Sequence, residues 1–339
     1  MKAKNVSGQA PGGKRVKLAE VLPLDTPILA QIFPIYACNF KCNYCTFSVG
    51  LKERGFISDK VSMDFELFKK CIDDMTNFPN KIKTLRFVGM GEPLLHKDIA
   101  KMIEYAVSKN IADKVEILTN GSLLTREISD SLIKNGLSRL LISIQGTTKE
   151  KYKEVSKIDI DFDKFVENLR YFFEQSRGKA QLHIKIIDYA IESEEDEKKF
   201  YEIFGDICDT IGVEHAGPIF PGVNYDSVLE GKKSDTTQFG LPIFDVKICP
   251  QPFFHMQINP DGKVVPCYSL YYPIILGDCN KESVYGIWNS KKYKDFRRKM
   301  LEGTENVSEI CKNCEIIKHR LFSEDLLNND AERLKKFYE

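Results

Sequence analysis

Long apolar runs, an excess of charge and an export signal are all missing from this sequence. No uninterrupted apolar stretch approaches the ~20 residues that a membrane helix needs, and the Gly- and Lys-rich residues 1–17 lack the apolar core of a secretory signal. Lys plus Arg and Asp plus Glu number 49 each, so a net charge of zero does not favour a nucleic-acid partner. We therefore expect a cytoplasmic protein that binds neither a membrane nor a nucleic acid.

What the chain does have is ten cysteines, which are unlikely disulfide partners in a protein without an export signal. Cys38, Cys42 and Cys45 fall within eight residues, and no fourth cysteine is near them in the sequence. A structural zinc site needs four closed ligands. A 4Fe–4S cluster held by three thiolates instead leaves one iron open for a further molecule. The spacing favours that cluster, with a zinc site or a structural cluster as the alternative.

Strand-like and helix-like segments alternate through the middle of the chain. The expected strands are residues 28–36, 83–91, 114–121, 138–146, 180–190 and 213–220. The expected helices are residues 63–78, 97–110, 125–136, 162–176 and 193–212, the first capped by Ser62 or Asp64. Six such units predict an α/β fold with a parallel sheet, either doubly wound or a partial barrel, and with its chemistry at the carboxyl ends of the strands.

The three-cysteine pattern CxxxCxxC, with Tyr44 before the last cysteine, resembles that of the radical S-adenosylmethionine (SAM) superfamily. The resemblance implies a partial (β/α)6 TIM-type barrel over residues 27–220. It also implies that SAM chelates the open iron beside Tyr44. The reduced cluster then cleaves SAM to a 5′-deoxyadenosyl radical, which abstracts a substrate hydrogen. An external electron donor such as flavodoxin or ferredoxin is the implied partner, together with a small-molecule substrate.

The segment GMGEP follows the second expected strand and is similar to the GGEP motif of that family. The glycines let backbone carbonyls approach a small cation closely. By this resemblance, the backbone and the Glu92 carboxylate hold the ammonium group of SAM. The expected SAM-binding residues of this turn are Gly89, Met90, Gly91 and Glu92.

Side-chain alternation along three later strands gives further candidates. Asn120 is expected to face the interior of the barrel at the end of the third strand. Ser143 takes the family's ribose-contacting position, and Gln145 stands where the family often has Asp. His183 and Lys185 are expected to face inward from the fifth strand, where they would contact substrate or simply bond to one another.

A second set of cysteines follows a Gly-, Ser- and Asp-rich linker or covering loop at residues 221–248. Its expected ligands are Cys249, Cys267, Cys311 and Cys314. Spacing alone leaves zinc and iron–sulfur open. The segments PDGKVVPC and IWNS and the closing CxxC resemble the SPASM and twitch subdomains of radical SAM enzymes, which implies a single auxiliary 4Fe–4S cluster in residues 249–320. Asp261 and Gly262 are expected to form a hairpin turn.

The expected layout is therefore a flexible N-terminal tail at residues 1–26, a barrel, a linker, an auxiliary-cluster subdomain and a C-terminal helix at 321–339. Within the superfamily, the cysteine layout is most similar to that of the 2-deoxy-scyllo-inosamine dehydrogenases. This implies oxidation of a small carbohydrate- or cyclitol-like alcohol, with the auxiliary cluster accepting an electron.

Under this hypothesis Lys185 or His183 removes the hydroxyl proton, because burial lowers a lysine's pKa. The alternatives are a peptide-modifying enzyme, a redox-neutral epimerase in which Cys279 returns a hydrogen, and a non-catalytic iron–sulfur or zinc protein. Cys279 remains open between hydrogen donor, cluster ligand and bystander. Cys71 and Cys208 are expected in the apolar core.

Overall fold

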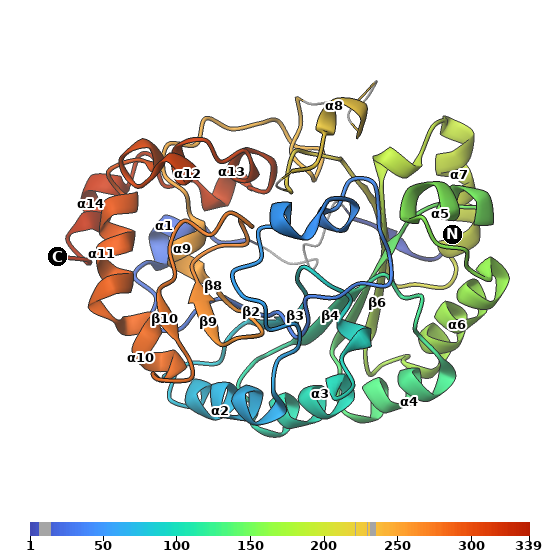
Figure 1. Cartoon of the computed structure of the whole chain (residues 1–339), viewed down its shortest axis with the longest axis horizontal. Coiled ribbons are helices and arrows are strands. Elements are labelled where there is room, and N and C mark those ends of the chain that lie inside the picture. The colour runs from blue at the N-terminus through green and yellow to red at the C-terminus, as the bar shows by residue number, and fades with distance from the viewer. Residues whose placement is uncertain (7–14, 221, 229, 231–234) are drawn as a thin grey trace.

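The computed structural model describes residues 1–6, 15–220, 222–228, 230 and 235–339. Its strands form one ten-stranded sheet in the order β1-β7-β6-β5-β4-β3-β2-β8-β9-β10 (Figure 1). The strands are β1 (Lys4–Asn5), β2 (Leu29–Ile32), β3 (Thr84–Phe87), β4 (Val115–Thr119), β5 (Arg139–Ile144), β6 (Gln181–Ile187), β7 (Thr210–Glu214), β8 (His255–Ile258), β9 (Lys263–Val265) and β10 (Gly277–Asp278).

Six of these strands, β2 to β7, are parallel neighbours in chain order. The helices that connect them lie along the outside of the curved sheet (Figure 1). They are α2 (Phe65–Met75), α3 (Ile99–Ser108), α4 (Arg126–Lys134), α5 (Lys149–Ser156), α6 (Phe162–Gln175) and α7 (Glu194–Phe204). The predicted α/β fold with a partial barrel is confirmed. Asp64 caps α2 by accepting from the backbone N–H groups of Glu66 and Leu67, as one of the two predicted caps.

The sixth strand lies earlier in the chain than predicted. The helix expected over residues 193–212 ends at Phe204, where Gly205 follows as the C-cap residue. The strand expected at 213–220 is β7, which begins at Thr210 and ends at Glu214. The error came from extending an apolar helical pattern through Ile207 and Cys208, which are buried in the turn between the two elements.

The predicted flexible tail is wrong for the described residues of that segment. Lys4–Asn5 forms β1, which pairs in parallel with β7 and closes that edge of the sheet. The side chain of Ala3 is buried beside it. Leu18–Val21 forms α1, which buries Leu18 against the core. Residues 7–14 of the predicted tail lie outside the described part of the chain.

The C-terminal part contains shorter helices than the sequence suggested. They are α8 (Tyr225–Val228), α9 (Gln251–Phe254), α10 (Val284–Asn289), α11 (Lys291–Met300), α12 (Glu309–Lys312), α13 (Ile316–His319) and α14 (Ala331–Lys335). The single helix expected over residues 321–339 is instead a short 3-10 turn (Ser323–Asp325) followed by α14. Between them, the Asn328 side chain accepts from the N–H groups of Lys247 and Ile248, which holds the chain in a non-helical path.

The auxiliary region continues the sheet of the barrel. Strand β8 pairs in parallel with β2 over four residue pairs. Strands β8 and β9 form the predicted hairpin, with Gly262 at a positive φ of 88°. Part of the expected linker at residues 221–248 lies outside the described residues, and its described part includes α8. Within the described residues, no helix has both the length and the apolar character needed to cross a membrane.

Buried charges close the amino-terminal end of the barrel interior. The Glu116 carboxylate on β4 accepts from Arg86 on β3 at 3.0 Å and lies 3.8 Å from Arg139 on β5. All three side chains are nearly or fully buried. The buried carboxylate lies between two guanidinium groups, which compensates its charge. Because these side chains fill the amino-terminal end of the barrel, the reaction is expected at the carboxyl-terminal end.

Candidate functional site

The loop that carries the first three cysteines follows β2 at the carboxyl end of the sheet. The backbone N–H of Lys41 donates to the Ser156 carbonyl at 2.9 Å, and that of Asn43 donates to Val155 at 3.0 Å. Both acceptors are in the last turn of α5. Because that turn has free carbonyl groups, it supplies a fixed support for the loop. The cysteine loop is therefore held by the body of the barrel.

The three thiols of this loop lie near one another. Burial raises the pKa of Cys38 to about 12 and that of Cys45 to about 11. Burial also raises the pKa of Cys42, and the charges of Cys45 and Cys38 raise it further. Thiolates held together in this way need a cation among them. In the described part of the chain no three His, Cys, Asp or Glu side chains converge on a single-ion site, whereas a four-iron cluster spans more space than one ion.

Tyr44 and Gln145 connect this loop to the end of β5. The Tyr44 hydroxyl donates to Oε1 of Gln145, and the Cys42 sulfur lies 3.6 Å from the same oxygen. Nε2 of Gln145 donates to the Ser143 carbonyl at 2.9 Å and lies 3.5 Å from the Ser143 hydroxyl. The structure thus brings together Tyr44, Ser143 and Gln145. Gln145 stands where the family often has Asp. Its amide can accept a hydrogen bond from Tyr44 and donate one to the β5 backbone at the same time.

The two glycines of the GMGEP turn occupy positions that no side chain could share. A Cβ on Gly89, at φ +144°, would lie 2.4 Å from the Phe33 ring. A Cβ on Gly91, at φ +157°, would lie 2.1 Å from the Ile35 carbonyl oxygen. Both conformations favour glycine. The Met90 side chain is buried in an apolar cluster, so only its backbone is available to a ligand.

Glu92 ties this turn to the neighbouring strand. Its carboxylate accepts from the Thr119 hydroxyl at 2.5 Å, from the Asn120 N–H at 2.7 Å and from the Leu94 N–H at 2.9 Å. Its own N–H donates to the Ala37 carbonyl at 2.8 Å. Burial raises the pKa of Glu92, and the three donors oppose that shift. Glu92 therefore positions the turn, the strand end and the cysteine loop relative to one another.

Asn120 lies beside the first cysteine. Its Nδ2 donates to Oδ1 of Asn39 at 2.9 Å and lies 4.0 Å from the Cys38 sulfur. Its Oδ1 accepts from the N–H and the hydroxyl of Ser122. An amide N–H next to a cysteine sulfur favours the thiolate form. The predicted candidates Glu92 and Asn120 thus contact the cysteine loop from the ends of β3 and β4, and Tyr44 lies within the loop.

The interior of the barrel holds the two candidate bases at different depths. The Lys185 ammonium is paired with the Glu214 carboxylate, which also accepts from Nε2 of Gln238 at 2.5 Å. Burial lowers the pKa of Lys185, and Glu214 opposes the shift. His183 is two residues deeper, with Nδ1 2.8 Å from the Thr210 hydroxyl. Burial and the charge of neighbouring cations lower its pKa to about 3, so it is neutral at pH 7.

The second set of cysteines lines one enclosed pocket. The four sulfur-bearing residues are Cys249, Cys267, Cys311 and Cys314, and they come from the segments around α9, β9 and α12. Burial raises the pKa of each of these thiols. The charges of neighbouring cysteines of this set raise the pKa of Cys249, Cys267 and Cys311 further. Four thiols that line one pocket, with no His, Asp or Glu in its lining, form a complete donor set for an iron–sulfur cluster. The residues present fit the predicted auxiliary cluster.

Comparison with known proteins agrees with this geometry. Residues 32–203, just over half of the chain, match the family described as the radical SAM superfamily. The chain belongs to the radical SAM superfamily. Residues 249–315 match the SPASM family, described as an iron–sulfur cluster-binding domain. This radical SAM enzyme therefore uses SAM with a 4Fe–4S cluster and an auxiliary iron–sulfur cluster.

The names of two relatives of this radical SAM enzyme describe different reactions. The tungsten-containing aldehyde ferredoxin oxidoreductase cofactor-modifying protein of Pyrococcus furiosus is 26% identical over 298 residues, covering 77% of this chain and 80% of that protein. The S-adenosyl-L-methionine-dependent 2-deoxy-scyllo-inosamine dehydrogenase of Niallia circulans is 22% identical over 281 residues, covering 82% and 88%.

Two solved structures are also similar to the radical SAM enzyme. Streptococcus suis SuiB bound to the precursor peptide SuiA has a TM-score of 0.62 at 16% identity, covering 83% of this chain and 69% of that one. BtrN in complex with AdoMet and 2-DOIA has a TM-score of 0.51 at 19% identity, covering 85% and 92%. At these identities the likeness shows the fold alone.

Cys279 lies away from both cysteine sites of the radical SAM enzyme. It is fully buried beside Cys71 of α2, which raises the pKa of the Cys279 thiol through a side-chain hydrogen bond. It does not line the pocket of the four auxiliary cysteines. The positions of Cys71 and Cys208 in the core are as predicted. The structure thus gives no support to Cys279 as a ligand or as a hydrogen donor.

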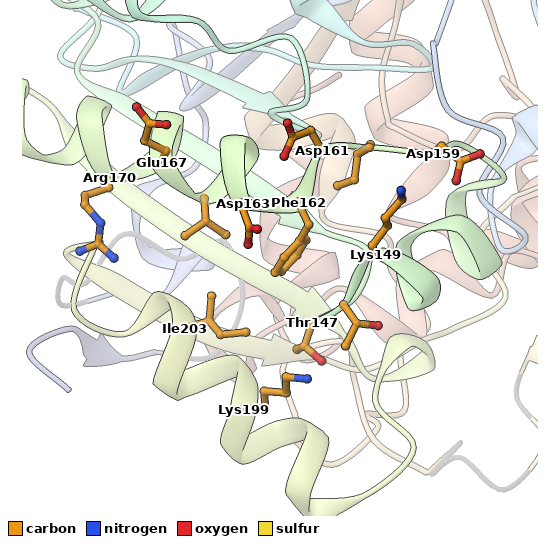
Figure 2. A pocket seen from close by; sticks show the side chains of 13 residues that line it. Thr147, Lys149, Asp159, Asp161, Phe162, Asp163, Glu167, Arg170, Lys199 and Ile203 are labelled. Atoms are coloured by element: carbon orange, nitrogen blue, oxygen red, sulfur yellow. The ribbon is translucent and has the colours of Figure 1, made fainter.

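A wide pocket of about 1090 Å³ lies on the outside of the barrel, between α5, α6 and α7. Figure 2 shows Phe162 of α6 together with Lys199 and Ile203 of α7 around it. Its rim mixes acidic and basic side chains, including Asp163 and Arg170. None of the predicted site residues lines it. The pocket is therefore separate from the chemistry of the two cysteine sites.

Two site residues were missed from the sequence. Glu214 lies within the strand expected at residues 213–220, but no inward-facing positions were assigned on that strand. With the strand at Thr210–Glu214, alternation puts Glu214 on the same face as Thr210. Gln238 comes from the covering segment before Cys249, where no periodic pattern predicts side-chain direction. Its contact with Glu214 depends on the tertiary fold.

Proposed function

We propose that this radical SAM enzyme is an oxidoreductase that dehydrogenates a small carbohydrate- or cyclitol-like alcohol. The observation that carries the proposal is the four-cysteine pocket. A cluster whose irons are all bound by protein thiolates has no free corner for substrate and is suited to accept an electron. When bound, SAM and its cluster supply the one-electron chemistry that removes a hydrogen atom.

The proton of the hydroxyl group would go to the Lys185–Glu214 pair. Both groups are buried, and the charged Lys185 ammonium forms an ion pair with the ionised Glu214 carboxylate. A proton can move along this pair between the amine and the carboxylate. Because burial lowers the pKa of Lys185, the amine is closer to giving and taking protons near neutral pH than an exposed lysine. Gln238 orients the carboxylate through its 2.5 Å hydrogen bond.

His183 is a weaker candidate for this role. Its ring is neutral, but it is directed to Thr210 at the deeper end of the barrel, near Arg139. A proton acceptor must come within hydrogen-bond reach of the substrate hydroxyl, and Lys185 is closer to the carboxyl ends of the strands, where the cysteine loop lies. We therefore assign the proton transfer to Lys185 and Glu214.

The Niallia circulans relative supports an alcohol-oxidising reaction, since it is named as a dehydrogenase and aligns over 88% of its length. The competing function is peptide modification, for which the fold likeness to the peptide-bound SuiB structure is the favouring observation. The two reactions differ in substrate size, whereas both would use the same cysteine sites.

The experiment is anaerobic incubation of the reduced protein with SAM and candidate alcohols, followed by mass analysis. A dehydrogenase yields a product lighter by two hydrogens together with one 5′-deoxyadenosine for each product. A product that has the substrate's mass in H2O, and that gains one non-exchangeable deuterium in D2O, would instead mark an epimerase. A modified peptide with inert alcohols would replace the proposal by the competing function.

A further inference from the structure

Arg320 lies between the auxiliary cysteine pocket and the Lys185–Glu214 pair. Its guanidinium carbon lies 5.1 Å from the centre of the Tyr268 ring, and Tyr268 directly follows the cluster ligand Cys267. The residue before it, His319, accepts at its carbonyl from the N–H of Gln238 at 2.7 Å. Since the Gln238 side chain binds Glu214, Arg320 is joined to the proposed proton-transfer pair through His319 and Gln238.

The cysteine loop of the barrel borders the same region. The hydroxyl of Tyr225 donates to the Tyr44 carbonyl at 3.1 Å. Burial raises the pKa of Tyr225 to about 12, and the charge of Arg320 opposes that shift. The same charge lowers the pKa of Lys185. The charge of Arg320 therefore acts on Lys185 in the barrel interior, on Tyr225 of α8, which contacts the cysteine loop, and on Tyr268 of the auxiliary region. This is the space between the two cysteine sites.

Arg320 has no counter-ion among the described side chains. Among the described residues it forms no ion pair, and its Nε is buried without a hydrogen-bond acceptor. Residues 7–14, 221, 229 and 231–234, which lie outside the described part, include no Asp or Glu. The Asp325 carboxylate, whose charge acts on Tyr268, is already bound by Arg15 at 2.7 and 2.9 Å.

A guanidinium that is partly removed from water without an anion is costly. The other cation of this region, Lys185, is compensated by Glu214. Among the described side chains of this region, one positive charge is therefore left uncompensated at Arg320. A planar guanidinium is well suited to bidentate recognition of a carboxylate or a phosphate.

We propose that Arg320 binds an anionic group of the substrate, so that the substrate is an alcohol that also carries a carboxylate or a phosphate. This inference rests on the proposed function in one respect, namely that the substrate lies between the two cysteine sites. Arg320 is a binding and specificity-determining residue, and Lys185 keeps the role of handling the hydroxyl proton.

The first test needs no turnover. The anaerobically prepared holoenzyme with SAM is labelled with phenylglyoxal in acetate, in inorganic phosphate or in chloride at equal ionic strength, and modified arginines are mapped by mass spectrometry. A saturating anion should slow labelling of Arg320 by about fivefold and leave the exposed Arg177 unchanged. Protection by acetate alone identifies a carboxylate site, and protection by phosphate alone identifies a phosphate site. Equal labelling in all three salts, or equal protection of Arg177, overturns the inference.

The second test uses the substrate itself. A metabolite extract is separated on an anion exchanger, and each fraction is tested for 5′-deoxyadenosine formation above the substrate-free rate. The active compound should be in the retained fraction. Arg320→Gln should raise its KM by about tenfold to a hundredfold, with Arg320→Lys in between, and should leave the substrate-free rate intact.

The two hypotheses fail in different ways. An active compound in the neutral flow-through, or an unchanged KM in Arg320→Gln, overturns the role of Arg320 while the dehydrogenase proposal stands. A retained compound that is modified without loss of two hydrogens overturns the dehydrogenase proposal while the anion site stands. If no fraction is active, the labelling experiment decides the role of Arg320 by itself.

Discussion

The GMGEP turn offers the sharpest test of how the site is built. In Gly91→Ala, the new Cβ would lie 2.1 Å from the Ile35 carbonyl oxygen and 2.9 Å from that of Ala37, both in the loop that leads to Cys38. The clash involves backbone atoms, so it is relieved only by moving this loop. The backbone conformation, φ +157°, adds strain for any L-residue. Overpacking and strain together cost about 2–5 kcal/mol.

Gly178→Ala is the matched control. Gly178 also has a positive φ, +74°, but its Cβ would meet no atom within 4 Å. In this variant only backbone strain destabilises the folded state, by about 1–2 kcal/mol. The two variants share the type of substitution and differ in the clash.

The assays are thermal unfolding and SAM affinity, measured on the reconstituted protein by calorimetry. Gly91→Ala should lower the unfolding temperature more than Gly178→Ala and weaken SAM binding by at least about tenfold, because a displaced loop misplaces the open iron. Gly178→Ala should bind SAM like the parent protein. Equal unfolding temperatures and equal SAM affinities in the two variants would refute the argument that this turn sets the geometry of the cysteine loop.

Further expectations concern single side chains. Lys185→Ala should abolish product while leaving substrate-free SAM cleavage intact, with the exposed Lys179→Ala as a control; unchanged turnover would end its role as base. Cys267→Ala should lower the iron content from about eight to about four atoms per chain and retain SAM binding, and a content that stays near eight would count against its role as a ligand. Gln145→Ala should weaken SAM binding several-fold, because Tyr44 loses its acceptor, which a titration with SAM would detect. Cys279→Ser should leave iron content and 5′-deoxyadenosine formation unchanged; loss of either would restore Cys279 to the site.

The sequence was sufficient for features that depend on short spacing. The CxxxCxxC loop, the glycine turn and the inward-facing Lys185 all follow from local patterns of three to eight residues. The same holds for the hairpin at Gly262, whose positive φ is a requirement of the turn itself. The parallel sheet followed from the alternation of strands and helices.

The parts that could not be predicted depend on contacts between distant segments. Arg320 meets Tyr268 and the neighbourhood of Gln238 only after the chain has folded, and nothing in the local sequence marks it. The N-terminal strand was missed because Lys4–Asn5 is short and polar, so its composition does not predict a strand. The segment is extended because it pairs with β7 in the folded chain. Glu214 was missed because the sixth strand was expected to start three residues late, so that Thr210 and Gly212, which share its face, lay outside the expected strand.

The pairing of β8 with β2 has a mechanical consequence. Leu29–Ile32 pairs along its whole length with His255–Ile258. Strand β2 leads to Cys38, whereas β8 turns through the hairpin into β9, which leads to Cys267. A continuous backbone ladder, rather than a flexible linker, thus connects the supports of the two cysteine sites. Under the proposed function, the span that an electron crosses between the two clusters is fixed when the chain folds, so tunnelling would need no domain closure.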